Sequence, residues 1–183
     1  MRLTSFISAA ALTLVLAGPA NAQAWAEFFD RQEYFTINFP GDPQVQPITY
    51  KTEKGTSLPA KVYSARDARG GEYRVTVVNY ASAPAEVATA MDEAAKTTRA
   101  KGEVKYDGKE NVDRMKDHRI SVILPGGRQL LALMLAHQNR LYIVEADVAP
   151  NAPPPAQFQA SLQVLDEDGV RIRYNPDGVT RQR

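Results

Sequence analysis

The 183-residue sequence contains no cysteine and only two histidines. Without cysteine the chain has no disulfide, no thiol chemistry and no attachment site for a lipoprotein anchor, so core packing must stabilise the fold unaided. A surplus of charge of one sign is also missing, because 22 lysines and arginines stand against 21 aspartates and glutamates. This near-neutral, mixed balance argues against a nucleic-acid partner.

Catalytic and metal-binding motifs are missing as well. The sequence holds no G-x-S-x-G, no H-E-x-x-H and no Walker motif. His118 and His137 lack metal-ligand spacing and are expected at the surface. Gly126-Gly127-Arg128 has the composition of an anion nest, and Asp166 to Gly169 faintly resembles a calcium loop, but ordinary turns explain both more simply. We therefore predict no catalytic, cofactor-binding or metal-binding residue, and a protein that is not an enzyme.

The first 22 residues have the pattern of a secretory signal peptide. Arg2 supplies the positive charge, Phe6 to Leu16 form a short apolar core, and Ala20-Asn21-Ala22 is a small-x-small cleavage site. The apolar core is too short to span a bilayer, although an uncleaved N-terminal anchor is the alternative. We predict cleavage after Ala22 and a periplasmic or secreted protein with no membrane span after cleavage.

Three apolar runs between Arg119 and Val148 predict an antiparallel meander at the centre of the domain. Gly126-Gly127 and Gln138-Asn139 are expected as two-residue hairpin loops between the strands. The predicted register pairs Leu124 with Gln129, Val122 with Leu131, Ile120 with Leu133, Leu135 with Tyr142, Leu133 with Val144 and Leu131 with Ala146.

Both faces of this meander are expected to be covered. Leu130, Met134 and Ile143 share a face with Arg119 and Glu145, and a face wetted by solvent would be more polar than this one. Helices are the expected cover. The predicted fold class is therefore α+β, an antiparallel sheet with helices on both faces in an α/β/α sandwich.

The remaining elements are predicted from periodicity and turn residues. One helix is expected to begin with Ser82 as its cap and to end at Gly102, and a second to run from Ala156 to Leu165. The segment 23–32 fits either a strand or a short helix. Further strands are predicted at 34–39, 45–51, 60–66, 72–80 and 170–174, and two short segments at 104–106 and 112–115 lead into the meander. The domain limits that follow are a single domain at 23–174 and a flexible tail at 175–183.

The order of four phrases carries a family resemblance. FTINFPGDP opens the sheet, the strand YRVTVVNY leads into a helix, RLYIVEA ends the meander, and FQASL lies in a short helix. The chain resembles the PsbP-like superfamily of α/β/α sandwiches over roughly Phe35 to Tyr174. The resemblance implies a bacterial envelope protein that acts as a binding or accessory module without catalysis. It assigns no functional residue, because the phrases mark strands and turns.

Arg119 and Glu145 form the most informative charged pair. The predicted register places them diagonally on one face, two strands apart and beneath a helix. An unpaired charge there is costly, so we expect the two side chains to meet, or Glu145 to lie at an open edge of the sheet. The structural interpretation is an ion pair, and the functional one is the polar floor of a pocket with Glu145 as an acid or base.

Two functions remain open from the sequence. The first is a non-catalytic periplasmic binding or accessory protein that contacts another envelope protein through an exposed apolar patch near Pro153–Pro155 or Trp25. The second is a small ligand carrier or enzyme with a pocket between sheet and helix. The predicted lining of that pocket is Arg119, Glu145 and a tyrosine, either Tyr142 or Tyr73. Neither function calls for a cofactor.

Overall fold

The computed structural model describes residues 25–112, 115–175 and 178–182. The predicted signal peptide lies outside these residues, and within them no helix has the length and apolar character needed to cross a membrane. The elements are β1 (Trp25–Asp30), β2 (Phe35–Pro40), β3 (Gln44–Lys51), β4 (Ser57–Arg66), β5 (Glu72–Asn79), a 3₁₀ turn η1 (Pro84–Glu86), α1 (Val87–Arg99), β6 (Glu103–Val112), β7 (Met115–Ile123), β8 (Gln129–His137), β9 (Arg140–Val148), α2 (Ala156–Ala160), β10 (Gln163–Val164), β11 (Arg171–Asn175) and β12 (Gly178–Gln182).

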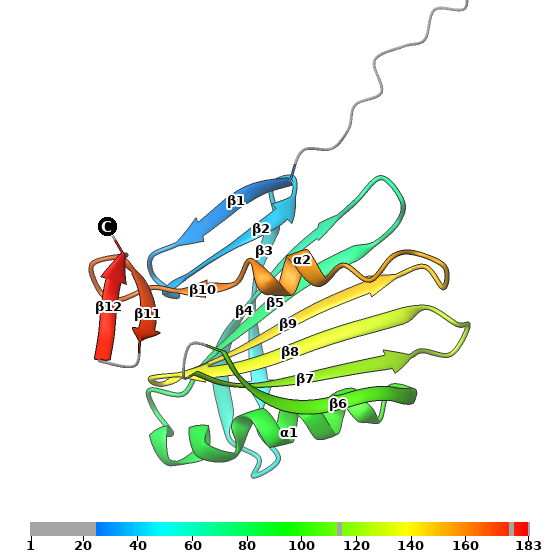
Figure 1. The fold of residues 1–183 in the computed structure, drawn as a ribbon. Coiled ribbons are helices and arrows are strands. Elements are labelled where there is room, and N and C mark those ends of the chain that lie inside the picture. Colours follow the sequence, from blue (N-terminus) through cyan, green and yellow to red (C-terminus); the bar gives the residue numbers. More distant parts are fainter. Residues whose placement is uncertain (1–24, 113–114, 176–177, 183) are drawn as a thin grey trace, which may run out of the picture.

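A twisted seven-stranded antiparallel sheet forms the body of the domain, in the order β3-β4-β5-β9-β8-β7-β6 (Figure 1). Two meanders, β3 to β5 and β6 to β9, join where β5 pairs with β9. The segment predicted at 104–106 lies within β6, and the segment at 112–115 reaches from the last residue of β6 to the first of β7, with 113–114 outside the described residues. The sheet is therefore wider than the three-stranded meander seen in the sequence.

Helix α1 covers one face of the sheet over β7, β8 and β9. Its buried residues are small, namely Ala90, Ala94, Ala95 and Thr98, so the helix can approach the sheet closely. Across the contact lie Ala132 and Met134, both fully buried. The helix begins after η1 and has no side-chain cap, so the predicted Ser82 cap is wrong.

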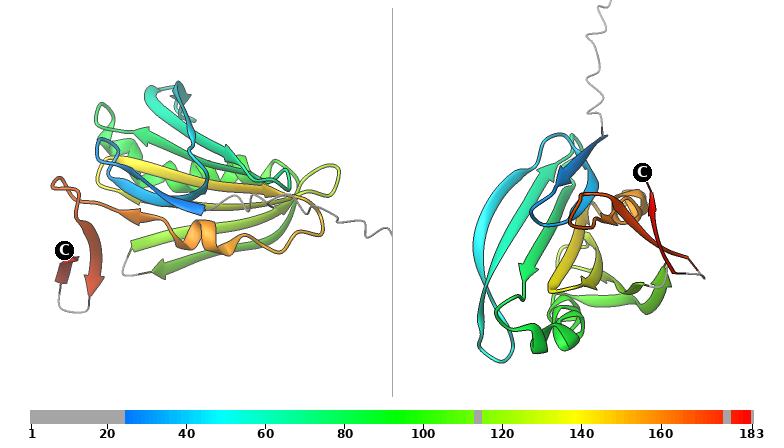
Figure 2. Two further views of the ribbon diagram at one scale, coloured as in Figure 1. Left: turned by 90° about the horizontal axis from the view of Figure 1, so that it is seen from above. Right: turned by 90° about the vertical axis from the view of Figure 1, so that its left-hand side faces the viewer.

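The opposite face is covered chiefly by a small sheet with the order β1-β2-β10. Views along two directions place this sheet and the short helix α2 on the side away from α1 (Figure 2). Strand β2 buries Phe35, Ile37 and Phe39 against the large sheet, and α2 adds Phe158. The undecided segment at 23–32 contains strand β1.

The α+β class is confirmed, but a helical layer on both faces is not shown, because the second face carries only the five-residue helix α2 beside the small sheet. The second predicted helix ends at Ala160, because Gln163 and Val164 pair with β2 as strand β10. Strand pairing with β2 satisfies the backbone hydrogen bonds that a longer helix would have satisfied internally. The covering layer on this face is therefore mainly sheet.

The first hairpin of the central meander differs from its predicted register by one residue. Pro125 and Gly126 occupy the two central positions of a turn in which Gly127 N–H donates to the Leu124 carbonyl at 2.9 Å, and Gly126 has φ +90°. Proline followed by a positive-φ glycine is the pattern of a type II turn. Ile123 therefore pairs with Gln129, not Leu124 with Gln129.

A one-residue shift moves every side chain of β7 to the other face of the sheet. Ile120 and Val122 pack against α1, whereas the predicted register placed them on the opposite face. The second hairpin is confirmed, with its pairs Leu135–Tyr142, Leu133–Val144 and Leu131–Ala146 as predicted.

The C-terminal segment forms a hairpin that projects at one end of the domain (Figure 2). Strand β12 pairs antiparallel with β11, from Arg171 opposite Gln182 to Asn175 opposite Gly178. Residues 178–182 thus form a strand within the segment 175–183 for which the sequence predicted a flexible tail. The sequence contained no apolar alternation there, and backbone pairing does not require one.

Candidate functional site

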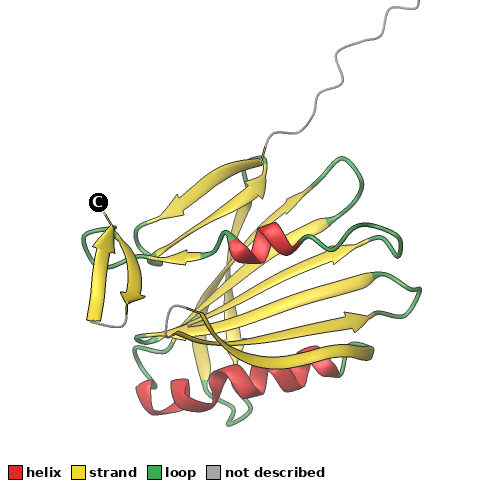
Figure 3. Ribbon diagram, in the orientation of Figure 1, coloured by secondary structure: helices red, strands yellow, loops and turns green. Residues whose placement is uncertain are grey.

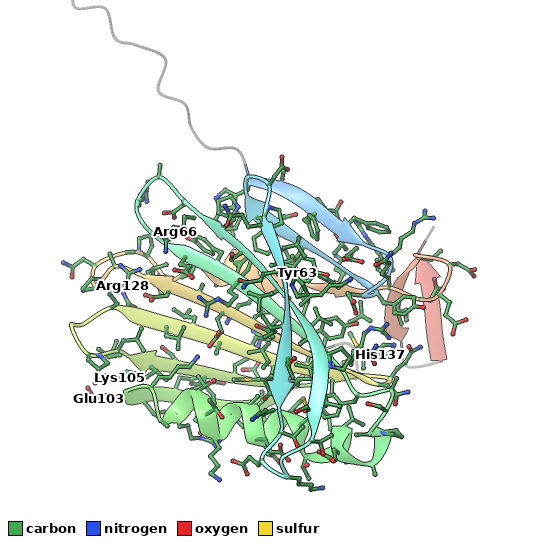
Figure 4. All side chains as sticks on the ribbon, turned by 180° about the vertical axis from the view of Figure 1, so that it is seen from behind. Tyr63, Arg66, Glu103, Lys105, Arg128 and His137 are labelled. Carbon is green, nitrogen blue, oxygen red and sulfur yellow. The ribbon has the colours of Figure 1, made fainter. Side chains whose placement is uncertain are left out.

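A groove of about 500 Å³ opens at one end of the large sheet, where the chain passes from β9 toward α2. Trp25, Tyr73, Phe158 and Pro153–Pro155 form its apolar wall, and Asp67 and Arg69 lie at its rim. We call this the Trp25 groove. Arg66 and Arg128 lie at this end of the sheet and His137 at the other (Figure 4).

Trp25 is the exposed anchor of the groove. Its side chain is 43% exposed, yet it is held edge-on against the Tyr73 ring at 4.8 Å and against the Phe158 ring at 6.2 Å between centroids. Tyr73 donates a hydrogen bond from its hydroxyl to Oδ2 of Asp67 at 2.9 Å. Burial, followed by this hydrogen bond, raises the pKa of Tyr73 to about 12, so the hydroxyl remains a donor at neutral pH.

The proline connector is tied down beside these rings. Proline has no N–H and cannot join a strand ladder, so Pro153–Pro155 leave the sheet and turn toward α2. The side-chain nitrogen of Gln129 lies 2.8 Å from the Pro150 carbonyl, and 3.3 and 3.2 Å from those of Ala149 and Ala152. One amide of strand β8 therefore ties the start of the connector to the sheet.

In Figure 3 the short helix α2 and the strand that follows it run across the front of the large sheet. A second, smaller pocket is lined by residues of β7 and β8 and of α2 and β10. Its volume is about 240 Å³. Asp117, Arg119, Gln159 and Gln163 are its polar residues, and we call it the Asp117 pocket. Nε and Nη2 of Arg119 both donate to Oδ2 of Asp117, at 3.1 and 2.9 Å.

The predicted contact between Arg119 and Glu145 is wrong. Arg119 lies on the face covered by α2, and Glu145 lies on the α1 face, where Lys101 Nζ donates to its carboxylate and Arg74 Nη1 stands 3.8 Å away. Glu145 is also not at an open edge, because its strand β9 lies between β5 and β8. The shifted register of β7 placed Arg119 on the other face, and the sheet now separates the two charges.

Neither histidine is an exposed side chain. His118 is 1% exposed and lies under α1, because the same register shift turned it inward. Its Nε2 is 2.6 Å from Oδ1 of Asp107, whose other oxygen accepts a 2.6 Å hydrogen bond from Nε of Arg99. His137 is half-buried at the end of β8, and burial lowers its pKa. The described residues contain no cluster of three or more metal-ligating side chains around either histidine.

Asp107, together with its partners Arg99 and His118, leads to a prediction about the pH dependence of stability. Hydrogen bonds from Arg99 and then His118 lower the pKa of Asp107 to about 2 in the folded protein, from an ordinary value of 3.8. A lowered folded pKa adds stability above the unfolded pKa and loses it as pH falls between the two values. We expect Asp107→Asn to lower the free energy of unfolding at pH 7, and the difference from wild type to shrink between pH 4 and pH 2. Urea unfolding at several pH values measures it, and a difference that does not change with pH contradicts the prediction.

Neither a protein-family model nor a curated protein matches this sequence. Among solved structures, the solution structure of cyanobacterial PsbP (CyanoP) from Synechocystis sp. PCC 6803 is similar, with 11% sequence identity and a TM-score of 0.49. The similarity covers 82% of this chain and 98% of that one. It is a likeness of fold, and membership of the PsbP-like superfamily remains a prediction.

Sequence reasoning named parts of both sites but did not assemble them. It singled out Trp25 and Pro153–Pro155 separately, and the structure brings them into one groove with Tyr73. It singled out Arg119 but missed Asp117, two residues earlier on the same face of β7. The signal that would have found Asp117 is the Pro-Gly pair at 125–126, which sets the register of β7.

Proposed function

We propose that this chain is a non-catalytic binding protein of the bacterial envelope, which holds an extended segment of another envelope protein in the Trp25 groove. The observation that supports it is the exposed indole of Trp25, fixed against two buried rings and flanked by three prolines. Large exposed aromatic side chains beside a groove are typical of interaction sites.

The groove is organised before a partner arrives. Edge-on contacts with Tyr73 and Phe158 restrict the Trp25 ring, and the Gln129 amide restricts the proline connector. A surface that is already ordered loses less conformational entropy on binding than a flexible one. Most of the binding energy is therefore expected to come from the contact with Trp25 itself.

The composition of the groove fits an extended apolar segment that contains proline. Aromatic-lined grooves bind polyproline-type segments because such segments are stiff and present a ridge of rings and carbonyls. The hydroxyl-bearing Tyr73 and the rim residues Asp67 and Arg69 can hydrogen-bond to the backbone of such a segment. The partner we expect carries this segment in an exposed loop or tail.

A photocrosslinking experiment in intact cells tests the proposal. A photoreactive residue at Gln157, exposed at the groove, should give a reproducible adduct with one envelope protein, identified by mass spectrometry. The same residue at Lys105, on the exposed outer strand β6, is the control and should not give that adduct.

Trp25→Ala should weaken this capture by about 30-fold or more, the effect of removing an aromatic hot spot. Trp25 is exposed, so the variant should keep the wild-type circular dichroism spectrum and nearly the wild-type melting temperature. The proposal fails if the Gln157 adducts match those of Lys105, or if Trp25→Ala leaves the adduct unchanged.

The alternative, a pocket with Arg119 and Glu145 in one floor, is not carried forward. The two side chains lie on opposite faces of the sheet. The Asp117 pocket is a separate feature with its own polar groups.

A further inference from the structure

Three polar atoms of the Asp117 pocket are buried and have no hydrogen-bond partner among the residues that the structure describes. They are Oδ1 of Asp117, Nε2 of Gln159 and Oε1 of Gln163. Asp117 is 5% exposed and Gln159 is 8% exposed. Buried polar groups are almost always satisfied, and an unsatisfied one costs free energy, so three in one small pocket point to a polar occupant of that pocket.

The arrangement at Asp117 selects the kind of partner. Nε and Nη2 of Arg119 both donate to Oδ2, and no described residue donates to Oδ1. Oε2 of Glu110 stands 3.7 Å from Nε of the same arginine. Two carboxylates therefore share one guanidinium, and the local charge is negative. A carboxylate oxygen in this setting attracts a charged N–H donor and repels an anion.

The rest of the pocket sets the size and shape of that partner. Its wall is aliphatic, with Leu133 and Leu135 from β8, Leu162 before β10 and Ile172 from β11. A volume of about 240 Å³ lies below the roughly 300–1,000 Å³ of ordinary ligand pockets, so the occupant is small. Gln163 adds a second free acceptor, and the carboxamide of Gln159 can turn its oxygen or its nitrogen toward the occupant.

We propose that the Asp117 pocket binds a small organic cation, a primary ammonium group on a short apolar body. The ammonium donates to Oδ1 of Asp117 and Oε1 of Gln163, and the apolar body packs against Leu133, Leu135 and Ile172. This site is independent of the Trp25 groove. Helix α2 lies between them, with Gln157 and Phe158 on the groove and the following residues on the pocket.

Three probes of the same ring size and different charge test the proposal on the full mature chain. Cyclohexylammonium, cyclohexanol and cyclohexanecarboxylate are titrated by ligand-observed NMR. We expect saturable binding of the ammonium and no binding of the carboxylate. The alcohol should bind at least about tenfold more weakly than the ammonium. Equal affinity for the ammonium and the alcohol would show a pocket that water alone satisfies, and would overturn the proposal.

Variants locate the site. Asp117→Asn should weaken cyclohexylammonium binding by about tenfold or more. Asp147→Asn removes another carboxylate paired with an arginine, Arg128, and should leave the affinity unchanged. Because Asp117→Asn also disturbs Arg119, a second variant, Ala160→Phe, fills the pocket from an exposed position without altering the core.

Loss of binding in Ala160→Phe supports the site even where Asp117→Asn fails to fold. Wild-type affinity in Ala160→Phe overturns it, and so does wild-type affinity in a folded Asp117→Asn. Trp25→Ala should bind cyclohexylammonium normally, which separates the failure of this proposal from failure of the proposed groove function.

Discussion

Phe35→Ala should lower the free energy of unfolding by about 3–5 kcal/mol. The Phe35 side chain is fully buried and lies between the two sheets. Its ring centroid stands 5.0 Å from that of Tyr63, 6.0 Å from Tyr142 and 6.1 Å from Phe28. Removing it leaves a cavity among three rings that cannot all collapse into it. Most domains are stable by only about 5–15 kcal/mol, so the loss is a large share of the total.

Urea unfolding at neutral pH measures this effect, and the same hairpin supplies the control. Phe29 lies on β1 with 43% of its side chain exposed. Phe29→Ala should therefore change the free energy of unfolding by less than about 1 kcal/mol. Similar losses of unfolding free energy in the two variants would contradict the view that packing of Phe35 holds the small sheet against the large one.

Gly102→Ala should lower the free energy of unfolding by about 3 kcal/mol. This is more than we expect when alanine replaces a turn glycine with positive φ. A Cβ added at Gly102 would stand 2.2 Å from the Ile123 carbonyl oxygen and 3.0 Å from its carbon. That carbonyl cannot move freely, because Ile123 pairs with Glu103 on one side and Gln129 on the other. Overpacking against a fixed backbone group destabilises by about 1–3 kcal/mol or more.

Gly55 is the matched comparison for Gly102. It has φ +85° and no atom within 4 Å of an added Cβ, so alanine there meets only backbone strain of about 1–2 kcal/mol. Thermal unfolding of both variants ranks the two effects. If Gly55→Ala proves the more destabilising, steric contact with Ile123 is not the reason that glycine follows α1.

The periodicity of apolar residues was enough to find most elements. A strand that is buried on one face alternates apolar and polar residues along the sequence. The strand FTINFP, the helix after Ser82 and the second hairpin at Gln138-Asn139 are all present. Helix ends were less accurate. The predicted helix at 156–165 stops at Ala160, since pairing of Val164 with Phe35 depends on a strand more than a hundred residues away.

One turn accounts for most of the errors at the candidate sites. The glycine pair at 126–127 satisfied the two-residue hairpin rule, but Pro125 with Gly126 formed a longer type II turn. The shift placed His118 under α1 and Arg119 on the other face of the sheet. Gln159 and Gln163 had no signal at all, because an isolated glutamine has no spacing that marks it as a pocket residue.

The seven-stranded sheet ends in two outer strands that discourage pairing with another chain. Strand β3 contains Pro47, which offers no N–H to an added strand. Strand β6 has an irregular register between Val104 and Tyr106 and carries Glu103, Lys105 and Lys109 along its length. Open sheet edges invite fibril growth, and charges, bulges and proline are the usual protection. The two edge strands of the large sheet thus carry features that oppose aggregation of this cysteine-free chain.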